Sequence, residues 1–230
     1  MSGRLASFRG PSTPTSSPAK QAQPPQSPLR TAESTYHRKV RTLLQDLRTV
    51  AENWDDIVLV DGVKAAQGLI DARTELDNEL ALVPVGTQPR HRFVEPKLTI
   101  MEKRIEQLDT VIVKLRKQFQ RMNSLVDSLE GVVIEAYKAK GWQFVQDPLW
   151  ATWSLEKFAT SIPVILVHYH RSLRMHVEVV NTLRSHSVSF DVSRESLSRW
   201  IAQPHLEENS WEAEWEDLCE AEIERWNSTK

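Results

Sequence analysis

Residues 97–140 read KLTIMEKRIEQLDTVIVKLRKQFQRMNSLVDSLEGVVIEAYKAK, and no proline interrupts them. Their apolar residues alternate spacings of three and four without a slip, at Leu98, Met101, Ile105, Leu108, Ile112, Leu115, Phe119, Met122, Val126, Leu129, Val133 and Ala136. Such a heptad repeat predicts one long, coiled-coil-like helix. Because a helix with an apolar seam is stabilised mainly by packing, we expect residues 36–82, a second copy of the chain or another protein to cover that seam.

A second long helical segment precedes this one. Its apolar residues also follow helical spacing, at Tyr36, Val40, Leu43, Leu47, Val50, Trp54 and Ile57. We expect Asp61–Gly62 to bend or end the helix, because a shifted stripe then continues through Ala65, Leu69, Ala72, Leu76 and Leu80. Residues 83–96 hold three prolines and a glycine, which predicts a loop between the two long helices.

Shorter helices are expected after the heptad repeat. Gly141 should end the long helix, and a loop should follow over residues 142–153. A third helix is predicted from about Ser154 to Ser185, with Pro163 either kinking it or marking its first turn. Ser193 is a plausible N-cap for a short helix that carries Trp200 on its apolar face and ends at the Gln203–Pro204 pair, residues predicted to break it.

The last segment is acidic and rich in tryptophan. A helix is predicted over about residues 210–226, with the large apolar residues Trp211, Trp215, Leu218 and Trp226 near one face. No stretch shows the alternation of a β-strand over a convincing length. The sequence therefore predicts an all-α protein with three parts: a disordered Ser/Pro-rich tail (1–34), a coiled-coil hairpin of two long helices (35–140) and a C-terminal helical region (141–230).

Composition excludes several classes of function. Seven glycines in 230 residues, two of them in the first ten, are few for a nucleotide-binding loop, and no catalytic constellation of residues stands out. We therefore expect no enzyme, no cofactor and no metal. A net charge of −2 argues against direct nucleic-acid binding. The single cysteine, Cys219, fits a reducing compartment, and we expect neither a signal peptide nor a membrane span.

Two groups of residues resemble the cyclin-dependent kinase 2-interacting protein family. The early group is NWDDIVL at residues 53–59, which is similar to the family's Asn/Asp-Trp-x-x-Leu-Ile-Leu signature. The late group begins with Thr-Trp at residues 152–153 and ends with LSRWIAQPHLE at residues 197–207, which is similar to Leu-Ser-x-Trp-x-x-Gln-Pro-aromatic. Between them the series continues through Phe158, Tyr169, Leu173, Leu183 and His186. The resemblance covers roughly residues 45–210, and His205 stands where an aromatic residue is usual.

This resemblance implies a non-catalytic helical adaptor. Its implied partners are cyclin-dependent kinase complexes, the replication-checkpoint kinase and a hexameric AAA ATPase assembly linked to DNA replication and ribosome maturation. Nucleus and cytoplasm are the expected locations. The rival hypothesis is a homodimeric coiled-coil subunit of a tethering or kinetochore-type complex, which the heptads of residues 98–136 fit equally well.

The candidate site residues are those that could either anchor a partner or pack the protein's own helices. They are Trp54, Trp153, Tyr169, Trp200, Gln203, Pro204, Trp211 and Trp215. Tryptophan is enriched in binding hot spots, but we favour internal packing for Trp153 and Trp200. Ser17 and Ser27 are candidate phosphosites, because each begins a Ser-Pro-x-basic sequence typical of cyclin-dependent kinase substrates, although a Ser/Pro-rich tail produces such strings by composition.

Overall fold

The computed structural model describes residues 34–150, 152–185 and 187–207. The candidate phosphosites Ser17 and Ser27, and the predicted helix with Trp211 and Trp215, lie outside these residues. Within them the fold is helical with no strand, and an isolated bridge between Pro148 and Ser154 is the one β-type pairing recorded there. The predicted all-α class, with a long antiparallel hairpin and additional C-terminal helices, is confirmed.

The first long helix continues past the predicted bend. Helix α1 (Thr35–Asp56) begins at Ser34, whose side chain accepts a hydrogen bond from the backbone N–H of His37. A π-helical turn, η1 (Ile57–Gly62), then leads without a break into α2 (Val63–Ala81). A π turn contains one residue more than an α turn, so the shift between the two apolar stripes is explained by this turn and not by the end of a helix.

Helix α3 (His91–Lys140) is longer than its heptads predicted. The predicted loop at 83–96 was too long, because residues 91–96 already belong to this helix. Pro96 is the sixth residue of this helix and removes one of its backbone hydrogen bonds, a loss that the packing of the flanking residues outweighs. Gly141 ends the helix, as predicted, with a positive φ of 85° that favours glycine.

Two corrections concern the region that follows. Residues 142–153 were predicted to be loop, but Trp142–Gln146 form a short helix, α4, whose Val145 is fully buried. Helix α5 (Leu155–Arg184) begins at Ser154, as predicted, and passes through Pro163 without ending. Pro163 therefore does not mark the first turn. It has no backbone N–H, so the helix lacks one hydrogen bond there, and packing against the neighbouring helices compensates for this loss.

The last two described helices follow one another with a single residue between them. Helix α6 (Phe190–Ala202) is capped by Ser189 and not by Ser193, which lies inside the helix and is buried. Gln203 ends α6 with φ 40°, the only positive value at a non-glycine position among the described residues. Pro204 begins α7 (Pro204–Glu207), because its fixed φ suits the first position of a helix.

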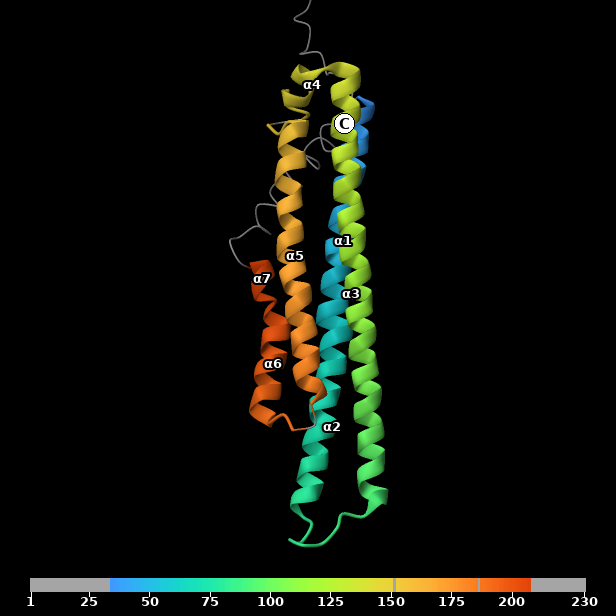
Figure 1. The fold of residues 1–230 in the computed structure, drawn as a ribbon, viewed down its shortest axis with the longest axis vertical. Helices are drawn as coiled ribbons and strands as arrows, with labels where there is room; N and C mark the ends of the chain where they lie inside the picture. The colour runs from blue at the N-terminus through green and yellow to red at the C-terminus, as the bar shows by residue number, and fades with distance from the viewer. Residues whose placement is uncertain (1–33, 151, 186, 208–230) are drawn as a thin grey trace, which may run out of the picture. The chain divides into compact units, whose positions relative to one another are not determined.

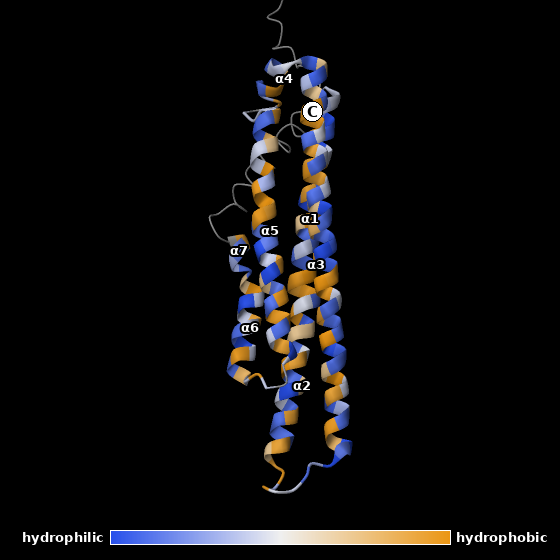
Figure 2. Ribbon diagram, viewed as in Figure 1, coloured by the Kyte–Doolittle hydropathy of each residue, from blue (hydrophilic) through white to orange (hydrophobic). Residues whose placement is uncertain are grey.

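The seam of α3 is covered within the chain. Helix α3 packs against α1, α2 and α5, and α6 lies against α2 and α5 (Figure 1). Eight of the twelve heptad residues are buried, and the other four, Leu98, Ile105, Phe119 and Val133, are partly buried against the same core. Apolar residues recur along all these helices, as Figure 2 shows by colour. No second copy is needed to cover the seam.

Candidate partner-binding site

Four aromatic side chains from three helices meet near the middle of the bundle. They are Trp54 on α1, Tyr169 and His176 on α5, and Trp200 on α6, and we call this cluster the aromatic junction. The rings of Trp54 and Tyr169 pack edge to face with their centroids 5.1 Å apart. Such pairs contribute about 0.5–1.5 kcal/mol beyond the burial of their area, so the junction holds α6 and α5 against the first long helix.

Trp200 is fixed by the π turn. Its side chain is fully buried, and its Nε1–H donates a 3.0 Å hydrogen bond to the backbone carbonyl of Val58. That carbonyl also accepts from the backbone N–H of Val63, five residues further along, which is the bond that defines a π turn. The turn thus gives α6 a specific acceptor, and a buried indole N–H is satisfied there.

Gln203 joins the end of α6 to α1. Its side-chain oxygen accepts a 3.1 Å hydrogen bond from Nε1–H of Trp54, and its side-chain nitrogen donates to Oδ1 of Asp55 at 3.1 Å. Burial raises the pKa of Asp55, the hydrogen bond from Gln203 opposes this, and the charge of Asp56 adds to the rise. A glutamine supplies the one acceptor and one donor that this position needs.

His176 fills the space between the two tryptophans as a neutral ring. Its centroid lies 4.3 Å from that of Trp200, with the rings at 84°, and its Nδ1 lies 2.8 Å from the carbonyl of Ser172. This contact makes Nδ1 the protonated nitrogen, and Nε2 is buried with no hydrogen-bond partner. Burial lowers the pKa of His176 to about 4, although the carbonyls of Ser172 and Trp200 favour the charged form and oppose the shift.

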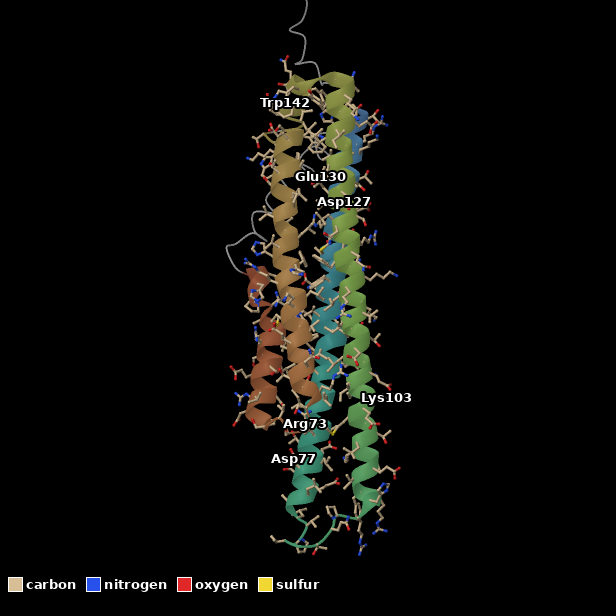
Figure 3. All side chains as sticks on the ribbon, in the orientation of Figure 1. Arg73, Asp77, Lys103, Asp127, Glu130 and Trp142 are labelled. Carbon is tan, nitrogen blue, oxygen red and sulfur yellow. The ribbon has the colours of Figure 1, made fainter. Side chains whose placement is uncertain are left out.

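A buried arginine makes a second connection below the aromatic junction. Arg73, labelled on α2 in Figure 3, is 4% exposed. It donates from Nη2 to the carbonyl of Leu183 at 2.6 Å and from Nη1 to Oγ of Ser193 at 3.1 Å. Burial lowers its pKa, and the charge of Asp77 opposes this effect. The guanidinium lies at the C-terminal end of α5, where the helix dipole favours a cation.

The structure therefore brings together four of the predicted residues, and two others among the described residues, Trp153 and Pro204, lie outside the junction. Trp54, Tyr169, Trp200 and Gln203 share the junction. Trp153 lies near the other end of α5 and is half-buried. Its ring centroid is 5.2 Å from that of Phe158, and Nζ of Lys157 lies over its ring, 4.3 Å from the centroid. Pro204 is exposed at the start of α7.

Three residues of this region were missed by sequence reasoning. His176 falls on the helical stripe of Tyr169 and Leu173, which could have indicated a buried position. Arg73 was missed because its charge suggests exposure, although it lies four residues after Leu69. Gly62 was expected only to bend the helix, yet it allows the indole of Trp200 to approach, since a Cβ there would lie 2.4 Å from Cζ2 of Trp200.

Replacing Gly62 tests this close approach. We expect Gly62→Ala to lower the free energy of unfolding by about 1–3 kcal/mol, the typical cost of overpacking, despite the better helix propensity of alanine. The matched control is Gly131→Ala in α3, where a Cβ meets nothing within 4 Å, and which we expect to raise the free energy of unfolding by up to about 1 kcal/mol. Urea denaturation of both variants measures these values, and a stabilising Gly62→Ala would contradict the packing described.

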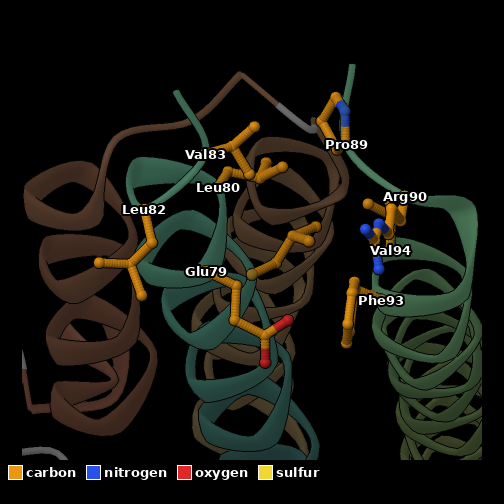
Figure 4. Close-up of a pocket in the computed structure, with 9 residues that line it drawn as sticks. Glu79, Leu80, Leu82, Val83, Pro89, Arg90, Phe93 and Val94 are labelled. Atoms are coloured by element: carbon orange, nitrogen blue, oxygen red, sulfur yellow. The ribbon is translucent and has the colours of Figure 1, made fainter. Parts of the chain in front are cut away.

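Exposed apolar residues gather at the turn of the long hairpin. We call residues 77–100 the hairpin tip; there the ends of α2 and α3 extend past α5 and α6 (Figure 1). Its exposed apolar side chains are Leu80, Leu82, Val85, Phe93 and Ile100, of which Leu82 is 85% exposed and Phe93 53%. A hollow of about 380 Å³ lies between the two helix ends, with Leu80 and Phe93 on opposite walls (Figure 4). Such a surface is typical of protein contacts.

In the part of the chain that the structure describes, no group of three or more His, Cys, Asp or Glu side chains could hold a metal ion. His168 and His170 differ in position: His168 is buried and bonded through Nδ1 to the carbonyl of His205, whereas His170 is exposed beside Phe119. Over the same ranges, none of the helices combines the length and the apolar character needed to cross a membrane.

Fold and site together define an all-helical bundle protein with a buried aromatic junction and an apolar hairpin tip. The chain is 30% identical over 191 residues to the cyclin-dependent kinase 2-interacting protein of Bos taurus, covering 80% of this chain and 88% of that protein. It is 23% identical over 189 residues to the Homo sapiens protein of the same name, with the same coverage. No family model matches. The chain belongs to the cyclin-dependent kinase 2-interacting protein family, whose two compared members are named as interacting proteins and not as enzymes.

Proposed function

We propose that this protein is a non-catalytic helical adaptor that binds cyclin-dependent kinase complexes, and that the hairpin tip is its docking surface. The name of the two relatives supports the kinase partner. The observation that carries the docking surface is the exposure of Leu82 and Phe93 beside an apolar hollow, since the conspicuous aromatic residues of the family signature, Trp54 and Trp200, are fully buried.

The hairpin tip combines an apolar centre with a charged rim. Its hollow is lined mainly by apolar side chains, with Glu79 and Arg90 at the edge. Lys97 pairs with Glu75 and, at 3.8 Å, with Glu79, which leaves the two helix ends tied together by exposed ion pairs. An interface usually has an apolar core surrounded by polar groups, so a partner that inserts one or two large apolar side chains would fit here.

Charges placed in the hairpin tip should weaken kinase binding. We expect the double variant Leu82→Asp, Phe93→Asp to weaken binding of a purified cyclin–cyclin-dependent kinase 2 complex at least tenfold, because each carboxylate would be desolvated in the interface. Isothermal titration calorimetry on the full chain measures the affinity. Both side chains are exposed, so the fold should be retained, and circular dichroism checks this.

The matched control is Leu59→Asp, Val60→Asp. These two residues are also exposed, by 45% and 61%, but lie on the π turn away from the hairpin tip. The control variant should bind the kinase complex as the wild type does. Equal affinity of the hairpin-tip variant and the wild type would reject the hairpin tip as the docking surface, and no binding by the wild-type chain would reject the kinase partner itself.

The further partners are proposed on the family resemblance alone. They are the replication-checkpoint kinase and an AAA ATPase assembly in DNA replication and ribosome maturation, with action in the nucleus and cytoplasm. More than one partner could be accommodated, because Leu59, Val60 and Val113 are also exposed apolar side chains and lie outside the hairpin tip. Quantitative mass spectrometry of the same variants purified from cells would sort these partners by the surface each requires.

The rival hypothesis is a homodimeric coiled-coil subunit, in which a second copy of the chain would cover the apolar seam of α3. In the structure α1, α2 and α5 cover that seam, and side chains such as Leu108, Leu115 and Met122 are fully buried within one chain.

A further inference from the structure

A second cavity lies where η1 and the start of α2 face the middle of α3. Its volume is about 280 Å³, and the buried side chains of Ala65 and Val111 are among those that line it. The charged side chains that line it are Asp61 on η1, Lys64 on α2, and Arg104 and Lys114 on α3. We call this cavity the polar groove. It shares no lining residue with the hollow of the hairpin tip, so it is a separate site.

Arg104 is held in position by two neighbours. Its guanidinium lies against Gly68 on α2, where a Cβ would come within 2.7 Å of Nε and 3.0 Å of Cζ. Its Nη1 donates a 2.9 Å hydrogen bond to Oε1 of Gln107 on α3. An arginine restrained in this way loses less side-chain freedom when it binds a ligand. Gly68 therefore gives a cation a fixed place in the polar groove.

The polar groove carries an excess of positive charge. Nζ of Lys114 pairs with Oδ2 of Asp61 at 2.7 Å. Among the described residues, neither Lys64 nor Arg104 forms an ion pair with a carboxylate, and Asp61 is the only acid of the groove's lining. Three cations against one carboxylate leave a net charge of +2. An anionic ligand would therefore be attracted to this cavity.

The size of this charge is matched by a phosphoryl group. A phosphorylated serine or threonine carries about −1.5 to −2 charges at neutral pH and three acceptor oxygens. The planar guanidinium of Arg104 is suited to bind two of these oxygens side by side, and the amine of Lys64 adds a second positive charge. A carboxylate side chain has a single negative charge and would leave the polar groove net positive.

The length and lining of the polar groove favour a peptide over a nucleotide. The distance along α3 from Arg104 to Lys114 is about 15 Å, which matches about four residues of extended peptide. Among the described residues that line the groove, none is aromatic. A nucleotide base would therefore have no ring to stack on there.

We propose that the polar groove binds a phosphorylated serine or threonine of a partner protein, with Arg104 and Lys64 on the phosphoryl oxygens. Lys114, which Asp61 already pairs, would contact the flanking part of the peptide. This inference goes beyond the proposed docking of a kinase complex at the hairpin tip and does not depend on it. It assigns a second surface, selective for a modified partner, to the same chain.

Fluorescence anisotropy with labelled peptide libraries tests the proposal on the full chain. One library has a fixed central phosphoserine between degenerate flanks, a second has serine at that position, and a third has glutamate. We expect the phosphoserine library to bind about tenfold more tightly than either of the others, because charge-assisted hydrogen bonds to the phosphoryl group are lost in both. Equal affinity for the phosphoserine and serine libraries would overturn the proposal.

Two variants locate the binding in the polar groove. We expect Lys64→Gln and Arg104→Gln each to weaken binding of the phosphoserine library by about tenfold. The matched control is Lys103→Gln, because Lys103, labelled in Figure 3, is exposed on α3 next to Arg104 but does not line the groove. Lys64 is exposed, so its variant should fold as the wild type does, which circular dichroism checks. Phosphopeptide binding unchanged in both groove variants would reject this site.

Gly68→Ala tests the fixed position of Arg104 without a change of charge. The added Cβ would displace the guanidinium, so we expect weaker binding of the phosphoserine library. Gly131→Ala is the control, because a Cβ there meets nothing within 4 Å. Equal binding by Gly68→Ala and Gly131→Ala would show that the placement of Arg104 does not matter and would contradict the proposed geometry.

Other anions give outcomes that overturn the assignment. Equal affinity for the glutamate and phosphoserine libraries would make the polar groove a site for acidic peptides. Tighter binding of fluorescent ATP than of the phosphoserine library, lost in Arg104→Gln, would make it a nucleotide site. Displacement of the phosphoserine library by inorganic phosphate at an equal concentration would show that the peptide contributes nothing. These assays contain no kinase, so their failure is distinguishable from failure of the proposed function.

Discussion

Trp200→Ala should lower the free energy of unfolding by about 3–5 kcal/mol, the usual cost of removing a fully buried tryptophan. The substitution removes the ring that fills the space beside Gly62 and contacts His176. It also leaves the second acceptor position of the Val58 carbonyl without its donor. Because α6 is held to the first long helix largely through this ring, we expect α6 and α7 to exchange amide hydrogens faster as well. Urea denaturation and hydrogen exchange measure the two effects.

Two further variants separate packing from hydrogen bonding at this position. Trp200→Phe keeps much of the apolar volume but removes the Nε1–H donor, so we expect an intermediate loss of about 1–3 kcal/mol. Trp142→Ala is the control. Because Trp142 is 50% exposed, replacing it should lower the free energy of unfolding by less than about 1 kcal/mol. If Trp200→Ala proved as mild as Trp142→Ala, the aromatic junction would not be the element that holds α6 in place.

Acidification should destabilise the protein through His176. Its pKa is about 4 in the folded protein against an ordinary value of 6.5, so above pH 6.5 the ring is neutral in both folded and unfolded states. As the pH falls from 6.5 toward 4, the unfolded chain takes up a proton that the folded protein does not. Stability therefore falls with pH over this window. At about 1.36 kcal/mol per pKa unit, the loss amounts to about 3 kcal/mol.

His176→Phe isolates this contribution. Phenylalanine keeps a flat ring beside Trp200 and does not titrate. Carboxylates elsewhere titrate in both proteins, so the difference in their free energies of unfolding reports the histidine. We expect the variant to gain about 3 kcal/mol relative to the wild type between pH 7 and pH 4, measured by urea denaturation at each pH. A constant difference across this range would show that the ring is not buried in its neutral form.

The helices could be predicted from sequence because their apolar periodicity is strong. The seam from Leu98 to Ala136 needed only its spacing to predict α3, and Ser154 and Gly141 supplied recognisable ends. The boundaries at prolines were less reliable. Pro96 and Pro163 lie inside helices, because packing of the flanking residues outweighs the loss of one backbone hydrogen bond. Helix α4 was missed because five residues are too few to show a period.

The composition of the aromatic junction was only partly predictable. Trp54 and Trp200 were identified by their helical spacing and by the family resemblance, and Tyr169 and Gln203 by the resemblance, but neither signal gives distances between them. That they meet depends on α5 and α6 folding back on the first helix, and a sequence pattern does not encode such long-range pairings. The π turn gave one local signal, the change of apolar phase near Asp61–Gly62. The buried charge of Arg73 gave none, because its partners are a backbone carbonyl and a serine hydroxyl far along the chain.

The inserted residue of η1 affects the whole first arm of the hairpin, which is the continuous helix formed by α1, η1 and α2. One residue corresponds to about 100° of rotation on an α-helix, so the insertion resets which side of α2 points inward relative to α1. The same insertion presents the oxygen of Val58 to Trp200. Rotational alignment of the arm and attachment of α6 are thus set by one local irregularity, which makes the spacing between Trp54 and Gly62 as important to this architecture as the identity of either residue.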